Sequence, residues 1–144
     1  MKKLNKSYDL LVNDLIFLIE ENRKKLAVTA NAVLTITYWQ VGKRINKDFL
    51  DNKRAEYGKQ IVVSVARHLT SRYGKSFEEK NLRRMMQFAQ VFDDRKIVVS
   101  LIRQLSWTHF IALIPIKDPL QREFYTQMCL LEGWSVKTSD LGKV

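Results

Sequence analysis

The sequence is poor in the residues that shape turns and cross-links. Its 144 residues include five glycines, two prolines and one cysteine, Cys129. So few glycines and prolines argue against a fold of many strands joined by turns, and we expect a mainly α protein. A single cysteine excludes an internal disulfide and suits a reducing cytoplasm. One cysteine and two histidines are also too few to form a tetrahedral zinc site without added carboxylates. We therefore expect no metal and no cofactor, and we expect Cys129 to lie in the core.

No long apolar run is present either. The N-terminal stretch LLVNDLIFLI, residues 10–19, contains Asn13 and Asp14, and no small-residue cleavage site follows it. No run reaches the roughly 18 apolar residues that a membrane-spanning helix needs. The sequence therefore predicts a soluble, cytoplasmic protein with one domain over residues 1–144 and no membrane partner.

Positive charge, in contrast, is abundant. The chain has 25 Lys and Arg against 15 Asp and Glu, a formal net charge of +10. Residues 58–104 contain ten basic and four acidic side chains, whereas residues 105–144 contain four of each. A basic middle beside a neutral end indicates one positive face, as nucleic-acid binding requires. The sign of the charge suits an anionic membrane surface or an acidic protein partner equally well.

Apolar spacing predicts a long helical region at the N-terminus. Leucine and isoleucine recur at helical intervals after Ser7, which suits an N-cap, and a second helix is expected from about Thr29 to Leu50. We expect the two to form a helical hairpin over residues 7–52. Because no glycine or proline separates them, one long bent rod is the alternative. Their apolar stripes exceed the needs of one small core, which favours a homo-oligomer formed through these helices.

A helix–turn–helix arrangement is expected at the start of the core region, residues 58–136. Gly74 suits the end of its first helix, and Ser76 and Glu79 form a capping box for the second helix, residues 77–92. Basic and amide side chains of the kind that contact phosphates and base edges follow in the turn and along the second helix. The expected DNA-binding residues are Arg72, Lys75, Lys80, Arg83, Arg84 and Gln87. An ordinary solvated helix face is the alternative interpretation.

The remaining elements are less regular. Residues 97–101 suit either a short strand or a buried helical turn. Ser106 is expected to cap a short helix, and Asp118 to cap a last helix that closes at Gly133. Residues 137–144 form a tail. The last helix is expected to bury Phe124, Met128 and Leu131.

Candidate catalytic groups have simpler structural explanations. Glu78–Lys80 spells Glu-x-Lys, a nuclease motif, but Glu79 already serves the capping box. Ser106 and His109 resemble a nucleophile and its base, yet a cap explains the serine and no acid follows closely in sequence. We therefore predict no catalytic residue, no metal site and no enzyme activity for this chain.

Glycine and tryptophan add two structural expectations. Gly42 most simply allows two helices to approach closely, because a phosphate-binding loop would need more glycines. Trp39, Trp107 and Trp134 stand among apolar residues, which favours core packing over stacking platforms for bases.

Six separated phrases resemble a known family. In order they are YWQVGKRI (38–45), EYGKQIV (56–62), SFEEKNLRRM (76–85), LSWTHF (105–110), REFY (122–125) and GWSV (133–136). The pattern resembles the N-terminal domain of the YhcG family of predicted PD-(D/E)XK nucleases, over roughly residues 10 to 136. The resemblance implies a winged-helix-like, DNA-binding domain that precedes a nuclease domain. After Val136 the sequence KTSDLGKV departs from that pattern, and the nuclease chemistry is not expected in these residues.

Together these observations predict a mainly α domain with a helix–turn–helix or winged-helix-like core behind a long N-terminal helical hairpin. The expected function is DNA binding, as the targeting domain of a nuclease-associated, YhcG-like protein, with double-stranded DNA as the partner. The alternative is a protein-interaction or dimerisation module with a basic face.

Overall fold

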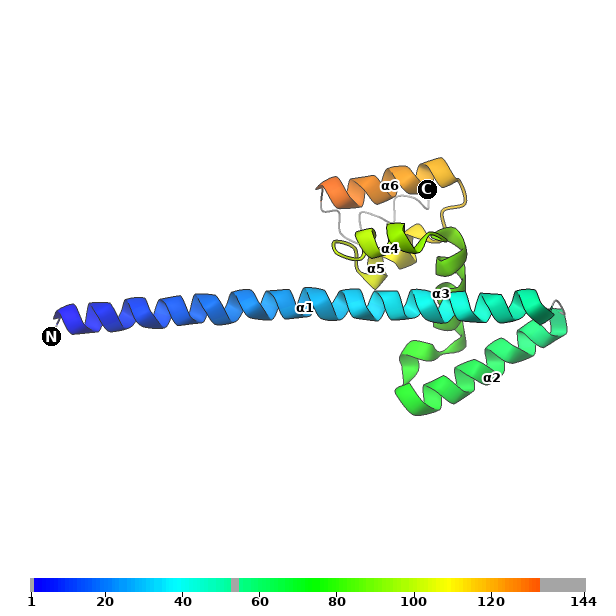
Figure 1. The fold of residues 1–144 in the computed structure, drawn as a ribbon, viewed down its shortest axis with the longest axis horizontal. Helices are drawn as coiled ribbons and strands as arrows, with labels where there is room; N and C mark the ends of the chain where they lie inside the picture. The colour runs from blue at the N-terminus through cyan, green and yellow to red at the C-terminus, as the bar shows by residue number, and fades with distance from the viewer. Residues whose placement is uncertain (1, 53–54, 133–144) are drawn as a thin grey trace.

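The computed structural model describes residues 2–52 and 55–132 and shows a helical protein (Figure 1). Neither of these two ranges contains a strand, so the expected mainly α fold is confirmed. The elements in chain order are α1 (Lys2–Asn52), α2 (Ala55–Tyr73), the 3₁₀-helix η1 (Lys75–Phe77), α3 (Glu79–Val91), α4 (Arg95–Leu101), α5 (Trp107–Leu113) and α6 (Pro119–Glu132).

The helical hairpin expected over residues 7–52 is wrong, because the single helix α1 runs through that whole range. Ser7 lies inside the helix instead of capping it. The physical reason is that residues 20–36 contain neither glycine nor proline, and the alanines among them favour the helix. The helix continues even at Thr29, whose Oγ1 donates back to the Lys25 carbonyl at 3.0 Å, a bond that slightly destabilises a helix. The alternative of one continuous rod is therefore the correct one, although the rod is straight and not bent (Figure 1).

The other helices gather along the C-terminal half of this rod (Figure 1). α2 lies on one side of α1, α4 to α6 lie on the other side, and α3 crosses α1 between them. The N-terminal half of α1 extends away from all of them. The fold thus consists of a small helical body on one end of a long helix.

Two buried clusters hold the body together. Trp39 on α1 belongs to the first, and its Nε1 donates a hydrogen bond to the Phe92 carbonyl at 2.7 Å. Trp107 is half-buried, with its ring 5.0 Å from the Tyr38 ring and 5.4 Å from the Phe88 ring. Core packing is therefore confirmed for two tryptophans, while Trp134 lies outside the described residues. The larger buried side chains of the two clusters are Trp39, Phe88, Phe110 and Leu113 in one, and Tyr38, Val62, Leu82 and Met85 in the other.

Gly42 marks the point at which α1 crosses α3. A Cβ at this position would lie 2.9 Å from the Met86 backbone nitrogen and closer still to the carbonyl carbon and oxygen of Met85. Real Cβ atoms do not approach other atoms so closely, so the two backbones meet here only because residue 42 has no side chain. The close helix packing expected of Gly42 is confirmed.

The capping box expected of Ser76 and Glu79 does not form. Ser76 lies in η1, and α3 begins at Glu79 after Glu78, whose side chain makes no capping hydrogen bond. Phe77 explains the shift, because its ring packs 5.9 Å from the Tyr38 ring and holds the turn in a 3₁₀ conformation. Gly74 ends α2 as expected, with a positive φ of 99° that side-chain-bearing residues rarely adopt.

In the C-terminal helices, the positions of the N-caps agree with the sequence better than the choice of buried side chains does. Residues 97–101 belong to a helix, α4, because Asp94 Oδ1 accepts from the Lys96 backbone nitrogen at 2.9 Å. Asp118 caps α6 in the same way, through the Leu120 nitrogen at 3.1 Å.

The face of α6 that packs on the core differs from the expected one. Phe124 and Leu131, expected inside, are exposed, Met128 is half-buried, and Cys129 is buried as expected. The physical reason is packing: Cys129 belongs to the first buried cluster, and Tyr125 and Leu130 on the same helix pack against it. Arg122 adds a hydrogen bond from Nη1 to the Ile116 carbonyl at 2.6 Å.

Candidate nucleic-acid interface

α2, the turn of residues 74–78 and α3 follow one another as a helix, a turn and a helix. α3 is fixed from behind, because Leu82, Met85 and Ala89 are buried. Asn46 on α1 adds a tether, donating through Nδ2 to the Met86 carbonyl at 2.8 Å. With its inner face held at these points, α3 presents a defined outer face to solvent.

The expected DNA-binding residues of α3 lie on that outer face. Lys80, Arg83 and Gln87 are exposed and Arg84 is half-buried. Spacings of three and four residues place them along one side of a helix. The two remaining candidates precede α3: Arg72 lies in the last turn of α2, with its guanidinium 5.5 Å from the Tyr73 ring centre, and Lys75 lies in η1.

Arg83 forms an ion pair that leaves it available to a ligand. Its Nη2 lies 2.9 Å from Glu79 Oε1, and both side chains are 47% exposed. Exposed pairs of this kind contribute only about 0–1 kcal/mol. A phosphate group can therefore replace the carboxylate at little cost, and Glu79, which the sequence assigned to a cap, instead orients an arginine.

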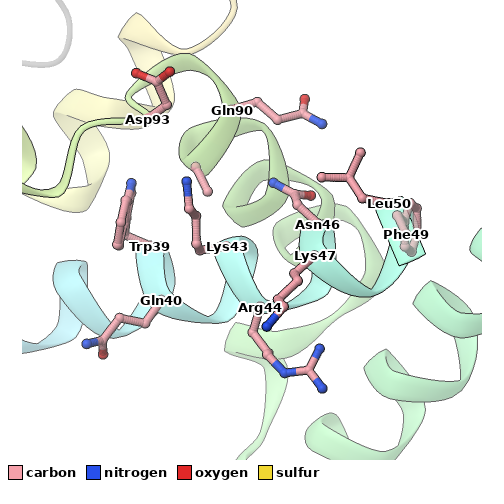
Figure 2. Close-up of a pocket in the computed structure, with 11 residues that line it drawn as sticks. Trp39, Gln40, Lys43, Arg44, Asn46, Lys47, Phe49, Leu50, Gln90 and Asp93 are labelled. Atoms are coloured by element: carbon pink, nitrogen blue, oxygen red, sulfur yellow. The ribbon is translucent and has the colours of Figure 1, made fainter. Parts of the chain in front are cut away.

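A second basic cluster lies on α1, beside the C-terminal end of α3. A cavity of about 750 Å³ opens there, and its lining includes Trp39 and Ala89. Figure 2 shows Gln90 and Asp93 across the cavity from the α1 side chains. We name the three cations of α1 that line this cavity the α1 cluster; they are Lys43, Arg44 and Lys47.

The α1 cluster and the outer face of α3 adjoin each other. Gln90 lines the cavity and follows Gln87 by three residues, so the two lie on neighbouring positions of the same exposed side. Two uncharged side chains, Gln87 and Gln90, therefore lie between the cations of α3 and the α1 cluster. Asp93 is the acidic residue among those that line the cavity, so the lining carries a net positive charge.

Sequence reasoning missed the α1 cluster. The signal was present, because Lys43 directly follows Gly42, the residue at which another helix was expected to approach, and Lys47 lies one helical turn further along. It was diluted because the first 57 residues also contain acidic side chains along the rest of the rod.

The candidate catalytic groups have structural partners. Ser106 and His109 hold the start of α5 together: the Ser106 backbone nitrogen donates to His109 Nδ1 at 3.1 Å, and the Ser106 hydroxyl lies 2.9 Å from the same atom. Within residues 2–52 and 55–132, no three His, Cys, Asp or Glu side chains gather in a way that could hold a metal ion. In the same ranges, no helix combines the length and apolar character needed to cross a membrane.

Comparison with known proteins identifies one family and one curated protein that match most of this chain. The model of the DUF1016 N-terminal domain family matches residues 14–140. A curated protein of Escherichia coli (strain K12), named "Putative nuclease YhcG", is 26% identical over 160 residues, which cover 90% of this chain and 43% of that protein. The chain therefore spans less than half the length of this relative. No solved structure gives a significant match.

Proposed function

This chain belongs to the DUF1016 N-terminal domain family, and we propose that it binds double-stranded DNA through the outer face of α3. The observation that carries the proposal is the row of Lys80, Arg83 and Arg84 on the second helix of a helix–turn–helix, held outward by a buried opposite face. The relationship to a protein named as a nuclease supports a nucleic-acid partner. The role we propose is that of the targeting domain of a nuclease-associated protein.

The dimensions of α3 suit the major groove. Its 13 residues span about 20 Å at 1.5 Å per residue, and a groove about 12 Å wide admits one helix. In that position Arg83 and Gln87 would face base edges and the nearer phosphates. Arg72 and Lys75 would contact one phosphate strand, and the α1 cluster the other.

The proposal does not include the winged-helix-like core that the sequence led us to expect. A wing is built from strands, and the described residues after α3, 95–132, form the helices α4, α5 and α6. The proposal therefore rests on α2, the turn and α3, with α1 as the brace behind them.

Replacing Lys80 and Arg83 together by alanine tests the proposed face. Each phosphate contact contributes about 0.9 to the slope of log affinity against log salt, so two lost contacts lower DNA affinity by up to about 60-fold at 0.1 M salt. Both side chains are exposed, so the free energy of unfolding should change by roughly 0.5 kcal/mol or less for each. Fluorescence anisotropy with a labelled duplex measures the affinity, and urea unfolding measures the stability.

A matched control removes the same charge elsewhere. Arg103 and Lys117 are exposed and lie outside α2, η1, α3 and the cavity lining. Their double alanine variant should bind duplex nearly as tightly as the unaltered chain. Equal losses in the two double variants would mean that net charge alone drives binding, and no loss in either would favour an acidic protein as the partner of the basic face.

We further propose that the chain binds DNA without cutting it. Metal-dependent cleavage requires carboxylates that converge on a divalent cation, and Asp94, one of the two adjacent aspartates, already caps α4. Plasmid incubated with the purified chain and Mg²⁺ or Mn²⁺ should stay intact. Cleavage that disappears in an Asp93→Ala variant would contradict this and would make the cavity beside α3 a catalytic site.

A further inference from the structure

The cavity beside the α1 cluster has an apolar surface that phosphate contacts do not require. Phe49 and Leu50 line it, and Leu50 is 71% exposed. Cations suffice to neutralise phosphates, so this leucine would stay in contact with water if the cavity served the DNA backbone alone. The volume of about 750 Å³ falls within the roughly 300–1,000 Å³ of pockets that hold small organic ligands. The cavity is therefore large enough for one organic group next to the bound phosphates.

Positive charge and apolar surface lie on the same side of α1. Lys43, Lys47 and Leu50 are separated by four and three residues, the spacing of one helix side. Among the residues that the structure describes, no cation of the α1 cluster forms an ion pair with a carboxylate. Their charges are therefore available to an anion. A ligand that fits this wall combines an anionic group with an apolar one.

The opposite wall of the cavity carries hydrogen-bonding groups of both kinds. Gln90, near the end of α3, and Asp93, just after it, lie across the cavity from the α1 side chains (Figure 2). An amide donates and accepts hydrogen bonds, whereas a carboxylate accepts them. For a phosphate alone this carboxylate would be a disadvantage, because like charges repel. It suits a ligand that also has an N–H donor.

A nucleotide has all three of these properties. Its base is an apolar ring system whose edge carries donors and acceptors, and in a strand a phosphate lies on each side of it. In a duplex the ring faces are stacked on neighbouring bases, so a paired base cannot enter a pocket without leaving the helix. An unpaired nucleotide, in contrast, can present its ring and its edge together.

We propose that this cavity binds the base of one unpaired nucleotide of a DNA strand, while the α1 cluster holds the phosphates on either side of it. This preference rests on the DNA binding proposed above and specifies the kind of DNA that binds best. Gln87 and Gln90 are one helical turn apart on α3, so the cavity adjoins the face proposed for the duplex. A duplex with a bulged nucleotide can then occupy both surfaces at once.

Three labelled duplexes of equal length test the preference: one fully paired, one with a single unpaired cytosine, and one whose bulged nucleotide lacks its base. Contacts to one base contribute a factor of about 10 or more in affinity, so the cytosine bulge should bind about 10-fold more tightly than the other two. The bulge without a base is the matched control, because it keeps the charge of the backbone and the freedom to bend. Fluorescence anisotropy measures the three affinities.

The outcomes separate this preference from DNA binding itself. Equal affinities for the two bulges, with the paired duplex also bound, would overturn the preference and leave the proposed DNA binding intact. Failure to bind any of the three duplexes would overturn both.

A free nucleotide offers the same base and phosphate without the strand. Because it lacks the further phosphate contacts of a strand, deoxycytidine monophosphate should displace the cytosine-bulged duplex only at concentrations far above that of the duplex. Displacement at equal concentrations would make a free nucleotide the ligand and contradict the proposed occupant.

Replacing Leu50 by serine tests the apolar wall. The Leu50→Ser variant should lose most of the preference for the cytosine bulge over the bulge without a base. Leu120→Ser is the matched control, because Leu120 is 78% exposed and lies on α6, outside the cavity lining. Both positions are exposed, so both variants should remain folded. An equal preference in the two variants would contradict a base in this cavity.

Replacing Asp93 by alanine tests the polar wall. Cytosine has an amino group that can donate to a carboxylate, and thymine has none, so the unaltered chain should bind a cytosine bulge about 5-fold more tightly than a thymine bulge. The Asp93→Ala variant should bind the two bulges equally. A variant that retains the cytosine preference would contradict the assignment of this wall to the base edge.

Discussion

Replacing Gly42 by alanine is expected to lower the free energy of unfolding by about 3 kcal/mol or more, at the upper end of what overpacking costs. The added methyl group would meet the carbonyl of Met85 and the nitrogen of Met86, which belong to the backbone of α3 and cannot rotate away. α1 and α3 must therefore separate. Separation strains the two hydrogen bonds on either side of the crossing, from Trp39 to the Phe92 carbonyl and from Asn46 to the Met86 carbonyl.

Gly58→Ala is the matched control for this substitution. Gly58 is also a buried helical glycine, but the atoms nearest to its added methyl group are ring carbons of Phe49 at 3.0 to 3.4 Å. A side chain can move where a backbone cannot, and alanine favours a helix over glycine by about 1 kcal/mol. Urea unfolding followed by circular dichroism should show a small change for Gly58→Ala and a large loss for Gly42→Ala. Similar values for the two would mean that α1 and α3 do not cross at Gly42.

Neutralising the α1 cluster is expected to cause the largest loss of DNA affinity. Three lost phosphate contacts correspond to up to about 500-fold at 0.1 M salt, from a slope of about 0.9 per contact. Lys43, Arg44 and Lys47 are exposed, so their triple alanine variant should remain folded. Lys43 also lies 5.6 Å from the Trp39 ring centre, a contact worth about 0.5–1 kcal/mol at exposed sites, and a small loss of stability is expected from it.

The control for the triple variant removes three exposed cations of the C-terminal helices and loops. Lys96, Arg103 and Lys117 lie outside the turn, α3 and the cavity lining, so their alanine variant should retain most of the affinity. Anisotropy titrations of both variants on one duplex give the comparison. A triple α1 variant with unchanged affinity would restrict the DNA-binding surface to α3 and the turn.

Much of the fold could be predicted from sequence because its signals are local. Gly74 identified the end of α2, and Asp118 before Pro119 identified the start of α6. Gly42 could be read as a close helix contact, although the partner helix could not. Side-chain periodicity and helix caps depend on residues within one or two turns, so they can be predicted without knowing the tertiary arrangement.

The errors occurred where distant residues decide a local choice. The capping box at Ser76 was a valid local signal, yet the packing of Phe77 against Tyr38, 39 residues earlier, moved the helix start to Glu79. The hairpin is a different kind of error, because the absence of glycine and proline between its two expected helices was already a local signal for one rod.

The same limit explains what could be foreseen of the candidate site. The cations of α3 share one helix, so their spacing sufficed to group them. The α1 cluster lies near Gln90 only because α1 crosses α3 at Gly42, and positions more than 40 residues apart leave no periodic trace of that contact. A site built from one element is visible in sequence, whereas a site built from two requires the fold.

The measurement that tests the central claim most directly is the affinity of the unaltered chain for a labelled duplex between about 50 and 200 mM salt. Cations in the turn, on α3 and in the α1 cluster predict that log affinity falls linearly with log salt, with a slope steeper than about −3. Two duplexes of unrelated sequence should share most of this slope, because phosphates carry it. A flat salt response, or no binding at the lowest salt, would contradict DNA binding by this face.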